Sequence, residues 1–178
     1  MNLKELTWEN HKSAERKDFA KVLMSGSIDC YLYYKYLYNQ YYCYLALESK
    51  LPLDELGIAE IARADKIRED INELEQVEWD CGYCDLVITN TTVEYVEYCQ
   101  ENYDKLLPHM YVRHFGDMYG GAMIAKKIPG QGQMYKFNDK EALKTKVRAM
   151  LDDSMADEAN RCFEFAIKLF GELSNERF

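Results

Sequence analysis

Residues 110–127 of the chain read Met-Tyr-Val-Arg-His-Phe-Gly-Asp-Met-Tyr-Gly-Gly-Ala-Met-Ile-Ala-Lys-Lys, a helical pattern that contains three glycines. Gly116, Gly120 and Gly121 lie at positions i, i+4 and i+5, which brings them onto roughly one face of the helix. A glycine inside a helix costs about 1 kcal/mol relative to alanine, so three of them need a compensating role. Close approach of a ligand to the bare backbone is one such role, and tight packing in a core is the alternative.

Polar side chains border this glycine face. Asp117 lies in the same turn of the expected helix, with Arg113 about one turn earlier and Tyr111 two residues before that. These groups are able to hold ordered water or a charge beside the exposed backbone. The segment therefore predicts a helix that covers a ligand and carries a polar border.

Length and composition describe one ordinary globular domain that spans residues 1–178, with 48% hydrophobic and 30% charged residues. The formal net charge of −9 argues against a nucleic-acid partner through bulk electrostatics. The N-terminus lacks the apolar core of a signal peptide, and no run approaches the roughly 18 apolar residues of a membrane span. We therefore expect a cytoplasmic protein with no membrane partner.

The six cysteines are scattered without the spacing of a disulfide framework, and a reducing compartment would keep them as thiols. Only Cys81-Gly-Tyr-Cys84 resembles a redox or zinc motif. No second pair of this kind and no neighbouring histidine pair accompany it, so the sequence does not favour a zinc site.

Helical spacing of apolar residues predicts an all-α, single-domain bundle, because no repeat or ladder of strands accompanies it. The pattern fails between Val77 and Thr92. Asn138 is the expected N-cap of the helix that starts at Lys140, with Glu141 at the third position. The expected helices cover residues 3–23, 28–50, one or two segments within 54–76, 92–107, 110–127, 140–152 and 157–173.

His11 is a candidate ligand on the first helix, one turn before Glu15, although a lone helical histidine is more often structural. The absence of a Glu-x-x-His motif argues against a carboxylate-bridged di-iron site. No nucleophile elbow, P-loop or dinucleotide-binding loop is present in its required context. Lys144 and Arg148 lie at i, i+4 on a third helix. A flat, dianionic cofactor clamped between two helices suits this combination of groups.

The chain closely resembles the heme oxygenases along nearly its whole length. The resemblance rests on His-x-x-Ala-Glu at 11–15, Tyr-x-Ala-Leu-Glu at 44–48, Tyr-x-Arg-x-x-Gly-Asp-x-x-Gly-Gly at 111–121, the pair Lys144 and Arg148 with Leu151-Asp152, and Phe163 in Cys-Phe-Glu-Phe. It implies a helical bundle that holds heme between a proximal helix and a glycine-rich distal helix.

The resemblance also implies roles for single residues that bind heme b. His11 is the expected axial ligand of the heme iron, and Glu15 polarises its second ring nitrogen. The distal helix lies over the other heme face. The remaining residues expected at the heme are Lys4, Lys144 and Arg148 near the propionates, Gly116, Gly120 and Gly121 beneath the distal face, and the aromatic rings of Tyr111 and Phe163.

The implied reaction is the O₂-dependent opening of heme at the α-meso carbon, giving biliverdin IXα, ferrous iron and CO. Heme is then both cofactor and substrate, and the bent glycine helix leaves only the α edge reachable. Asp117 is expected to anchor a water network together with Tyr44 and Arg113, which directs the oxygen chemistry toward the porphyrin.

Reduced ferredoxin is the expected electron donor, and the product is expected to enter bilin synthesis through a downstream bilin reductase. A basic ring could attract an acidic ferredoxin despite the net negative charge, although each lysine is equally compatible with a solvated helix face. Its members are Lys12, Arg16, Lys17, Lys126, Lys127, Lys144, Lys146 and Arg148.

Two positions depart from the family pattern. Trp8 stands where the family has a second basic residue near the propionates, and Tyr119 stands where many members carry a small serine. Trp8 weakens the expected cationic rim, and Tyr119 changes the space on the distal side.

Two other functions fit the same helical architecture. A heme carrier that does not degrade heme would keep His11 but would not need Asp117. A thiaminase-like enzyme would need a nucleophilic cysteine in its pocket, and the glycine-rich helix contains none. A helical interaction module without a cofactor would leave the glycine face unexplained.

Overall fold

The computed structural model describes residues 2–76 and 88–174, and over these residues the regular structure is entirely helical, as the sequence predicts. Four short 3₁₀ turns accompany the α-helices: η1 (Ala59–Ile61), η2 (Tyr103–Lys105), η3 (Gln133–Tyr135) and η4 (Asp153–Met155). The α-helices are α1 (Leu3–Leu6), α2 (Trp8–Glu15), α3 (Asp18–Met24), α4 (Cys30–Glu48), α5 (Ala64–Glu75), α6 (Asn90–Glu101), α7 (Leu107–Ala125), α8 (Lys140–Arg148) and α9 (Ala156–Ser174).

The first expected helix, 3–23, is wrong as a single element, because the chain breaks it twice. The Thr7 hydroxyl donates to the Leu3 carbonyl over 2.9 Å and leaves the Thr7 backbone outside the helical region. Lys17 is extended, with φ −64° and ψ 143°, and α3 begins directly after it. These breaks let α1, α2 and α3 follow the outside of the bundle.

Helix α8 is also capped one residue later than expected. The Asp139 carboxylate, and not Asn138, accepts the hydrogen bond of the Ala142 backbone N–H over 3.0 Å. The helix ends at Arg148, short of the expected residue 152. Similarly, α6 ends at Glu101, and Pro108 stands at the start of α7.

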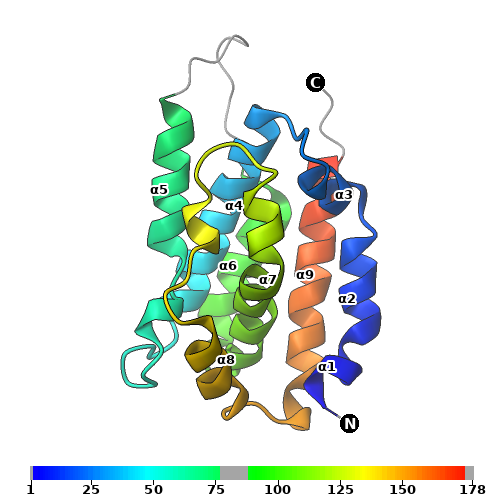
Figure 1. Cartoon of the computed structure of the whole chain (residues 1–178). Coiled ribbons are helices and arrows are strands. Elements are labelled where there is room, and N and C mark those ends of the chain that lie inside the picture. The colour runs from blue at the N-terminus through cyan, green and yellow to red at the C-terminus, as the bar shows by residue number, and fades with distance from the viewer. Residues whose placement is uncertain (1, 77–87, 175–178) are drawn as a thin grey trace.

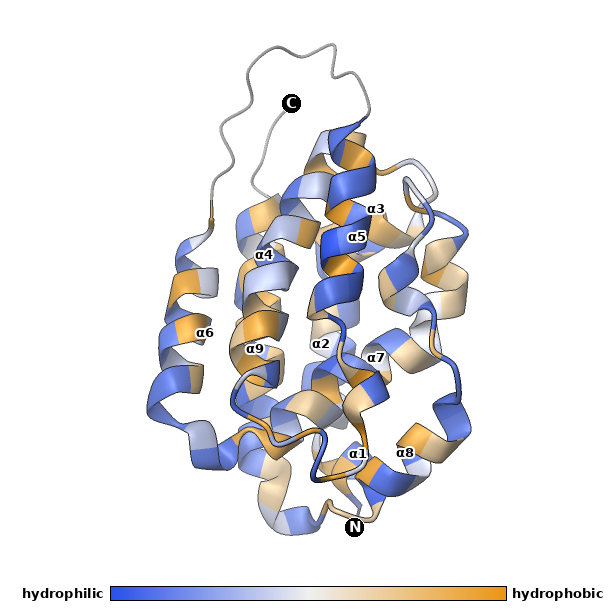
Figure 2. Cartoon of the chain, turned by 90° about the vertical axis from the view of Figure 1, so that its left-hand side faces the viewer, coloured by the Kyte–Doolittle hydropathy of each residue, from blue (hydrophilic) through white to orange (hydrophobic). Residues whose placement is uncertain are grey.

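Helix α4 forms the centre of the core. Tyr33, Leu37 and Leu47 are each completely buried on it, and α5 and α6 pack against its sides. Its tyrosines contribute large rings to this core, and the Tyr34 hydroxyl also donates to the Glu75 carboxylate of α5 over 2.8 Å. The side of α5 turned to the viewer in Figure 2 is mostly hydrophilic, whereas its apolar residues Ile67, Ile71 and Leu74 are buried.

Helix α9 places the site, because it packs against both α2 and α7 (Figure 1). The N-terminal helix that carries His11 and the glycine-rich helix are far apart in the sequence but share this one neighbour. Asn160 of α9 fixes the start of the chain, accepting from the Asn10 side chain over 3.0 Å and donating to the Leu6 carbonyl over 3.2 Å.

Candidate functional site

The glycines of α7 serve two different purposes. A Cβ atom built on Gly116 would meet nothing within 4 Å, and one on Gly120 would meet only the end of Ile124 at 3.8 Å. A Cβ on Gly121 would lie 2.8 Å from the Tyr135 ring. The expected open face therefore exists at Gly116 and Gly120, whereas the structure contradicts it at Gly121, where tight packing is the reason for glycine.

His11 lies on α2 with its two ring nitrogens in different situations. Nε2 is 3.5 Å from the Glu15 carboxylate, and Nδ1 is buried without a hydrogen-bond partner among the described residues. The Trp8 ring stacks on the imidazole at 5.6 Å and 16°, and Phe163 of α9 meets it edge-on at 5.8 Å. One nitrogen is thus held by a carboxylate while the other has no partner, the arrangement found in metal-ligating histidines.

Tyr44 and Asp117, expected to share a water network, are in direct contact. The Tyr44 hydroxyl of α4 donates to Asp117 Oδ2 of α7 and also lies 3.4 Å from the Arg113 carbonyl. Burial raises the pKa of Asp117 to about 6, and the hydrogen bond from Tyr44 opposes this rise. Burial also raises the pKa of Tyr44 well above its usual value, so the phenol stays protonated and can only donate to a carboxylate.

The Arg113 side chain forms its hydrogen bond elsewhere, although its guanidinium lies 5.7 Å from the centre of the Tyr44 ring. Its Nη1 donates to Gln40 Oε1 over 3.0 Å, and its guanidinium lies 4.2 Å from the centre of the Tyr95 ring. Nε is buried with no partner in the described part of the chain. The backbone of Arg113 therefore faces Tyr44, while the guanidinium belongs to a neighbouring buried cluster.

The cations of α8 gather around Tyr119 of α7, whose side chain is exposed. Lys144 Nζ lies 4.0 Å from the centre of the Tyr119 ring and 2.9 Å from Glu141 Oε1. The Arg148 guanidinium donates to the Tyr119 hydroxyl. Tyr119 of α7 is thus a contact that both cations share, and Lys144 is also held by Glu141.

The other predicted residues flank these groups. Tyr111 packs edge-on against Phe115 at 5.0 Å, on the same helix as the glycines. Lys4 lies apart from the α8 cations, beside Trp8, where they line a cavity of about 490 Å³ together with Asn2 and Glu5. Lys4 therefore approaches the site from the side of His11.

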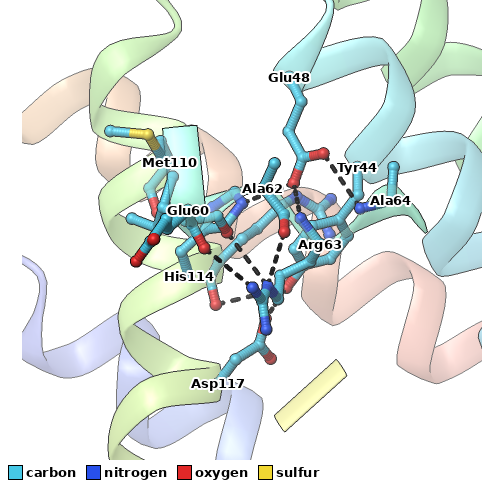
Figure 3. A network of polar contacts seen from close by, with 11 residues as sticks. Tyr44, Glu48, Glu60, Ala62, Arg63, Ala64, Met110, His114 and Asp117 are labelled. Atoms are coloured by element: carbon cyan, nitrogen blue, oxygen red, sulfur yellow. Dashed lines mark hydrogen bonds and ion pairs between the residues drawn. The ribbon is translucent and has the colours of Figure 1, made fainter. Parts of the chain in front are cut away.

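A buried polar network next to Asp117 was not predicted from the sequence (Figure 3). The Glu48 carboxylate accepts from the backbone N–H groups of Arg63, over 2.5 Å, and Ala64, over 3.0 Å, and lies 2.9 Å from His114 Nε2. The Arg63 guanidinium donates to the carbonyls of Glu60, Ala62 and Lys136. Glu48 stood in a recognised motif, but nothing in the sequence marked His114 or Arg63 as its partners.

Other sequence expectations concern metals and membranes. Cys81 and Cys84 lie outside the described residues. Within residues 2–76 and 88–174, no cluster of three or more histidines, cysteines or carboxylates is arranged to hold a metal ion. None of the helices in that part of the chain combines the length and apolar character needed to cross a membrane.

Comparison with known proteins agrees with the residue pattern. The family model described as "Heme oxygenase" matches residues 1–172. The chain belongs to the heme oxygenase family. Among curated relatives, the heme oxygenase of Rhodella violacea is 26% identical over 204 residues, covering 98% of this chain and 86% of that protein. The heme oxygenase of Pyropia yezoensis is 28% identical over 202 residues, covering 97% and 84%.

Solved heme oxygenases share the fold. The crystal structure of heme oxygenase-1 from the cyanobacterium Synechocystis in complex with heme superposes with a TM-score of 0.81, at 26% identity, over 96% of this chain and 90% of that one. The heme oxygenase of Leptospira interrogans gives 0.79 at 25% identity, over 96% and 97%. The all-α fold is therefore the fold of this family.

Alanine substitutions distinguish the two kinds of glycine in this heme oxygenase. We expect Gly121→Ala to destabilise the protein by about 1–3 kcal/mol, because its Cβ would overlap the Tyr135 ring. Gly116→Ala should leave stability unchanged or raise it by up to about 1 kcal/mol, because its Cβ points into open space. Urea unfolding of the heme-free variants measures both changes in stability. Equal changes for Gly116→Ala and Gly121→Ala would contradict the distinction between an open and a packed glycine.

The buried carboxylate of Asp117 makes the free energy of unfolding depend on pH. Its pKa, raised from 3.8 to about 6, means that the folded chain binds the proton more tightly than the unfolded chain. Its contribution to stability is therefore present below about pH 4 and lost as the pH rises through about 6. Relative to wild type, Asp117→Asn should gain on the order of 3 kcal/mol between about pH 4 and pH 7.5. Urea unfolding at both pH values tests this, and a pH-independent difference would contradict it.

Proposed function

We propose that this heme oxygenase opens heme at the α-meso carbon and releases biliverdin IXα, ferrous iron and CO. The proposal rests on one observation: α2 carries a histidine with a buried nitrogen that has no partner among the described residues, α7 carries an open glycine surface, and both helices pack against α9. A single flat ligand explains both features, whereas packing alone explains neither.

His11 would bind the heme iron through a ring nitrogen that has no partner among the described residues. Glu15 lies beside Nε2 while Nδ1 is unpartnered there, so the pairing with this carboxylate leaves one ring nitrogen for the iron. Trp8 and Phe163 would hold the plane of the ring by stacking and edge contact. The proximal ligand is thus positioned before heme arrives.

The distal side would approach heme through backbone atoms at Gly116 and Gly120. With no side chains there, α7 can lie close to the macrocycle and cover part of its edge, which would leave the α-meso carbon accessible. Gly121 would support this indirectly, since its contact with Tyr135 sets the position of the helix. Tyr111 would border the same face.

Lys144 and Arg148 would receive the propionates at the end of α7, with Lys4 on the side of α2. Both α8 cations now contact Tyr119, so a propionate would replace or join the phenol as their partner. A guanidinium matches a carboxylate with two parallel N–H donors, which makes Arg148 the better fixed point of the two.

Heme itself supplies the iron and the porphyrin at which O₂ is reduced and consumed. The protein's part is to hold protons and water beside it. Tyr44 occupies one oxygen of Asp117, so the carboxylate keeps lone pairs that can accept from an ordered water molecule. The Arg113 carbonyl offers a second acceptor next to the same phenol. We assign this pair of acceptors to the water network that directs the oxygen chemistry.

Electrons would come from reduced ferredoxin, and the product would pass to a bilin reductase in the cytoplasm. Not all members of the expected basic ring are free to receive an acidic donor. Lys127 donates to the Met24 carbonyl, Lys146 donates to the Gly57 carbonyl, and Lys12 pairs with Glu9. Arg16 and Lys126 are exposed, so they are the first cations of the ring to test by charge reversal.

The activity test is a heme titration without oxygen, followed by O₂, reduced ferredoxin and catalase, with the pigment analysed by chromatography. Wild type should give a Soret band that is replaced by biliverdin IXα absorption. Asp117→Ala should bind heme with similar affinity and lose most of its biliverdin output, because the water network loses its anchor. Normal turnover by Asp117→Ala would contradict the role, and a stable Soret band in wild type would identify a heme carrier.

A matched pair of histidine variants tests the axial ligand. His11→Ala should change the ferric heme spectrum and weaken heme binding, because the iron loses its nitrogen donor. His109→Gln is the control, since His109 is completely buried between Tyr95 and Glu158, each 3.0 Å from the ring. An unchanged spectrum in His11→Ala would remove His11 from the site.

A further inference from the structure

Both ring nitrogens of His114 face hydrogen-bond acceptors inside the protein. Nδ1 lies 3.2 Å from the Met110 carbonyl, Nε2 lies 2.9 Å from Glu48 Oε1, and the side chain is completely buried. A neutral imidazole has one N–H donor and one bare acceptor nitrogen. With a neutral ring, one of these two contacts would set a lone pair against a lone pair. A doubly protonated ring satisfies both.

The partner carboxylate cannot supply the missing proton without losing other bonds. Glu48 accepts from the backbone N–H groups of Arg63 and Ala64, which only donate, and these mark the beginning of α5. A carboxylate at a helix N-terminus is favoured in its ionised form. Three donors therefore converge on Glu48, and the pair is an imidazolium with a carboxylate, both buried.

We infer that His114 is doubly protonated and that its fixed positive charge keeps Asp117 ionised in the distal network. His114 precedes Asp117 by three residues on α7, and its ring meets the Tyr44 ring edge-on at 5.0 Å. Tyr44 is also the phenol that donates to Asp117. The catalytic consequence rests on the proposed function, whereas the protonation state of His114 does not.

Electrostatics around Asp117 agrees with this geometry. Burial raises the pKa of Asp117, while the hydrogen bond from Tyr44 and then the positive charge of His114 lower it toward about 6. Without the charge of His114 the carboxyl would remain protonated closer to neutral pH. A protonated Asp117 would offer an O–H where the water network needs an acceptor.

The other groups that act on Asp117 do not replace His114. The buried tyrosines stay neutral near pH 7, because burial raises their pKa values, and the two arginines keep their charge at every relevant pH. Among the described residues, these groups therefore do not change their charge near pH 7 in a way that could compensate for loss of the His114 charge. These buried tyrosines and arginines are Tyr33, Tyr36, Tyr44, Arg63, Arg113 and Tyr135.

His114 would thus be a positioning residue for the proposed reaction, acting through Asp117. The Glu48 pair also links α4, the start of α5 and α7, so the charge is held in place by three segments (Figure 3). Rigid placement matters because the effect of a charge on a carboxyl pKa depends on distance and on exclusion of water.

Nitrogen NMR of the heme-free protein, labelled with ¹⁵N-histidine, tests the protonation state directly. The His114 ring, assigned by its absence in His114→Gln, should show two protonated nitrogens at about pH 7. One protonated and one bare nitrogen at that pH would overturn the inference. The protonation state is read from the intact wild-type chain, and the variant serves only to assign the signal.

Carbon NMR of the Asp117 carboxyl tests the coupling. His114→Gln keeps an N–H donor for Glu48 but removes the charge, so the Asp117 midpoint should rise by about one pH unit or more. His109→Gln is the matched control, because it alters another completely buried histidine of α7 that pairs with a carboxylate, Glu158, and it should leave the midpoint unchanged. An unmoved midpoint in His114→Gln would overturn the inference.

Measurement of heme turnover then separates the proposed heme oxygenase function from the inference about His114. If wild type converts heme, the pH at which His114→Gln reaches half of its maximal rate should move upward together with the Asp117 midpoint. If wild type does not convert heme, both NMR results keep their meaning, because they are obtained without heme. If heme is converted while both nitrogens of His114 prove not to be protonated, the proposed function stands and this inference fails.

Discussion

Two buried carboxylates, those of Glu48 and Asp117, hold the distal helix α7 against the core. Glu48 joins the start of α5 to His114 of α7, and Asp117 joins α7 to Tyr44 of α4. Each carboxylate is removed from water, and each is stable there only because donors surround it. The position of α7 beside the candidate heme site therefore depends on these hydrogen bonds. Apolar packing could not replace them, because it does not fix the orientation of a helix in the way that a hydrogen bond does.

This dependence explains why the site carries a cost in stability. Burial alone raises the pKa of Asp117, so the folded chain would be more stable with a neutral group there. Retaining an acid in such a place is typical of functional sites, where strained or desolvated groups are kept for their chemistry. His11, with its buried and unpartnered nitrogen, shows the same property on the opposite helix.

The sequence predicted the helical class and the long helices α4, α7 and α9, because the periodicity of apolar residues is local information. The family resemblance placed Tyr44 and Asp117 at one site, joined through water, but it did not predict their direct contact. It did not predict the breaks at Thr7 and Lys17, which depend on a single hydroxyl bond and one extended residue. The direction of the Arg113 guanidinium was also inaccessible, since it is decided by side chains of other helices. Contacts between residues far apart in the sequence leave no local pattern.

The contrast between Gly116 and Gly121 has a consequence for how the distal helix can change in evolution. The three atoms nearest to an added Cβ at 121 all belong to Tyr135, so a smaller residue at 135 would relieve these contacts and the two positions are able to change together. An added Cβ at 116 meets no described atom within 4 Å. A small side chain there therefore needs no compensating substitution among its immediate protein neighbours, and at the proposed site the ligand would limit its size.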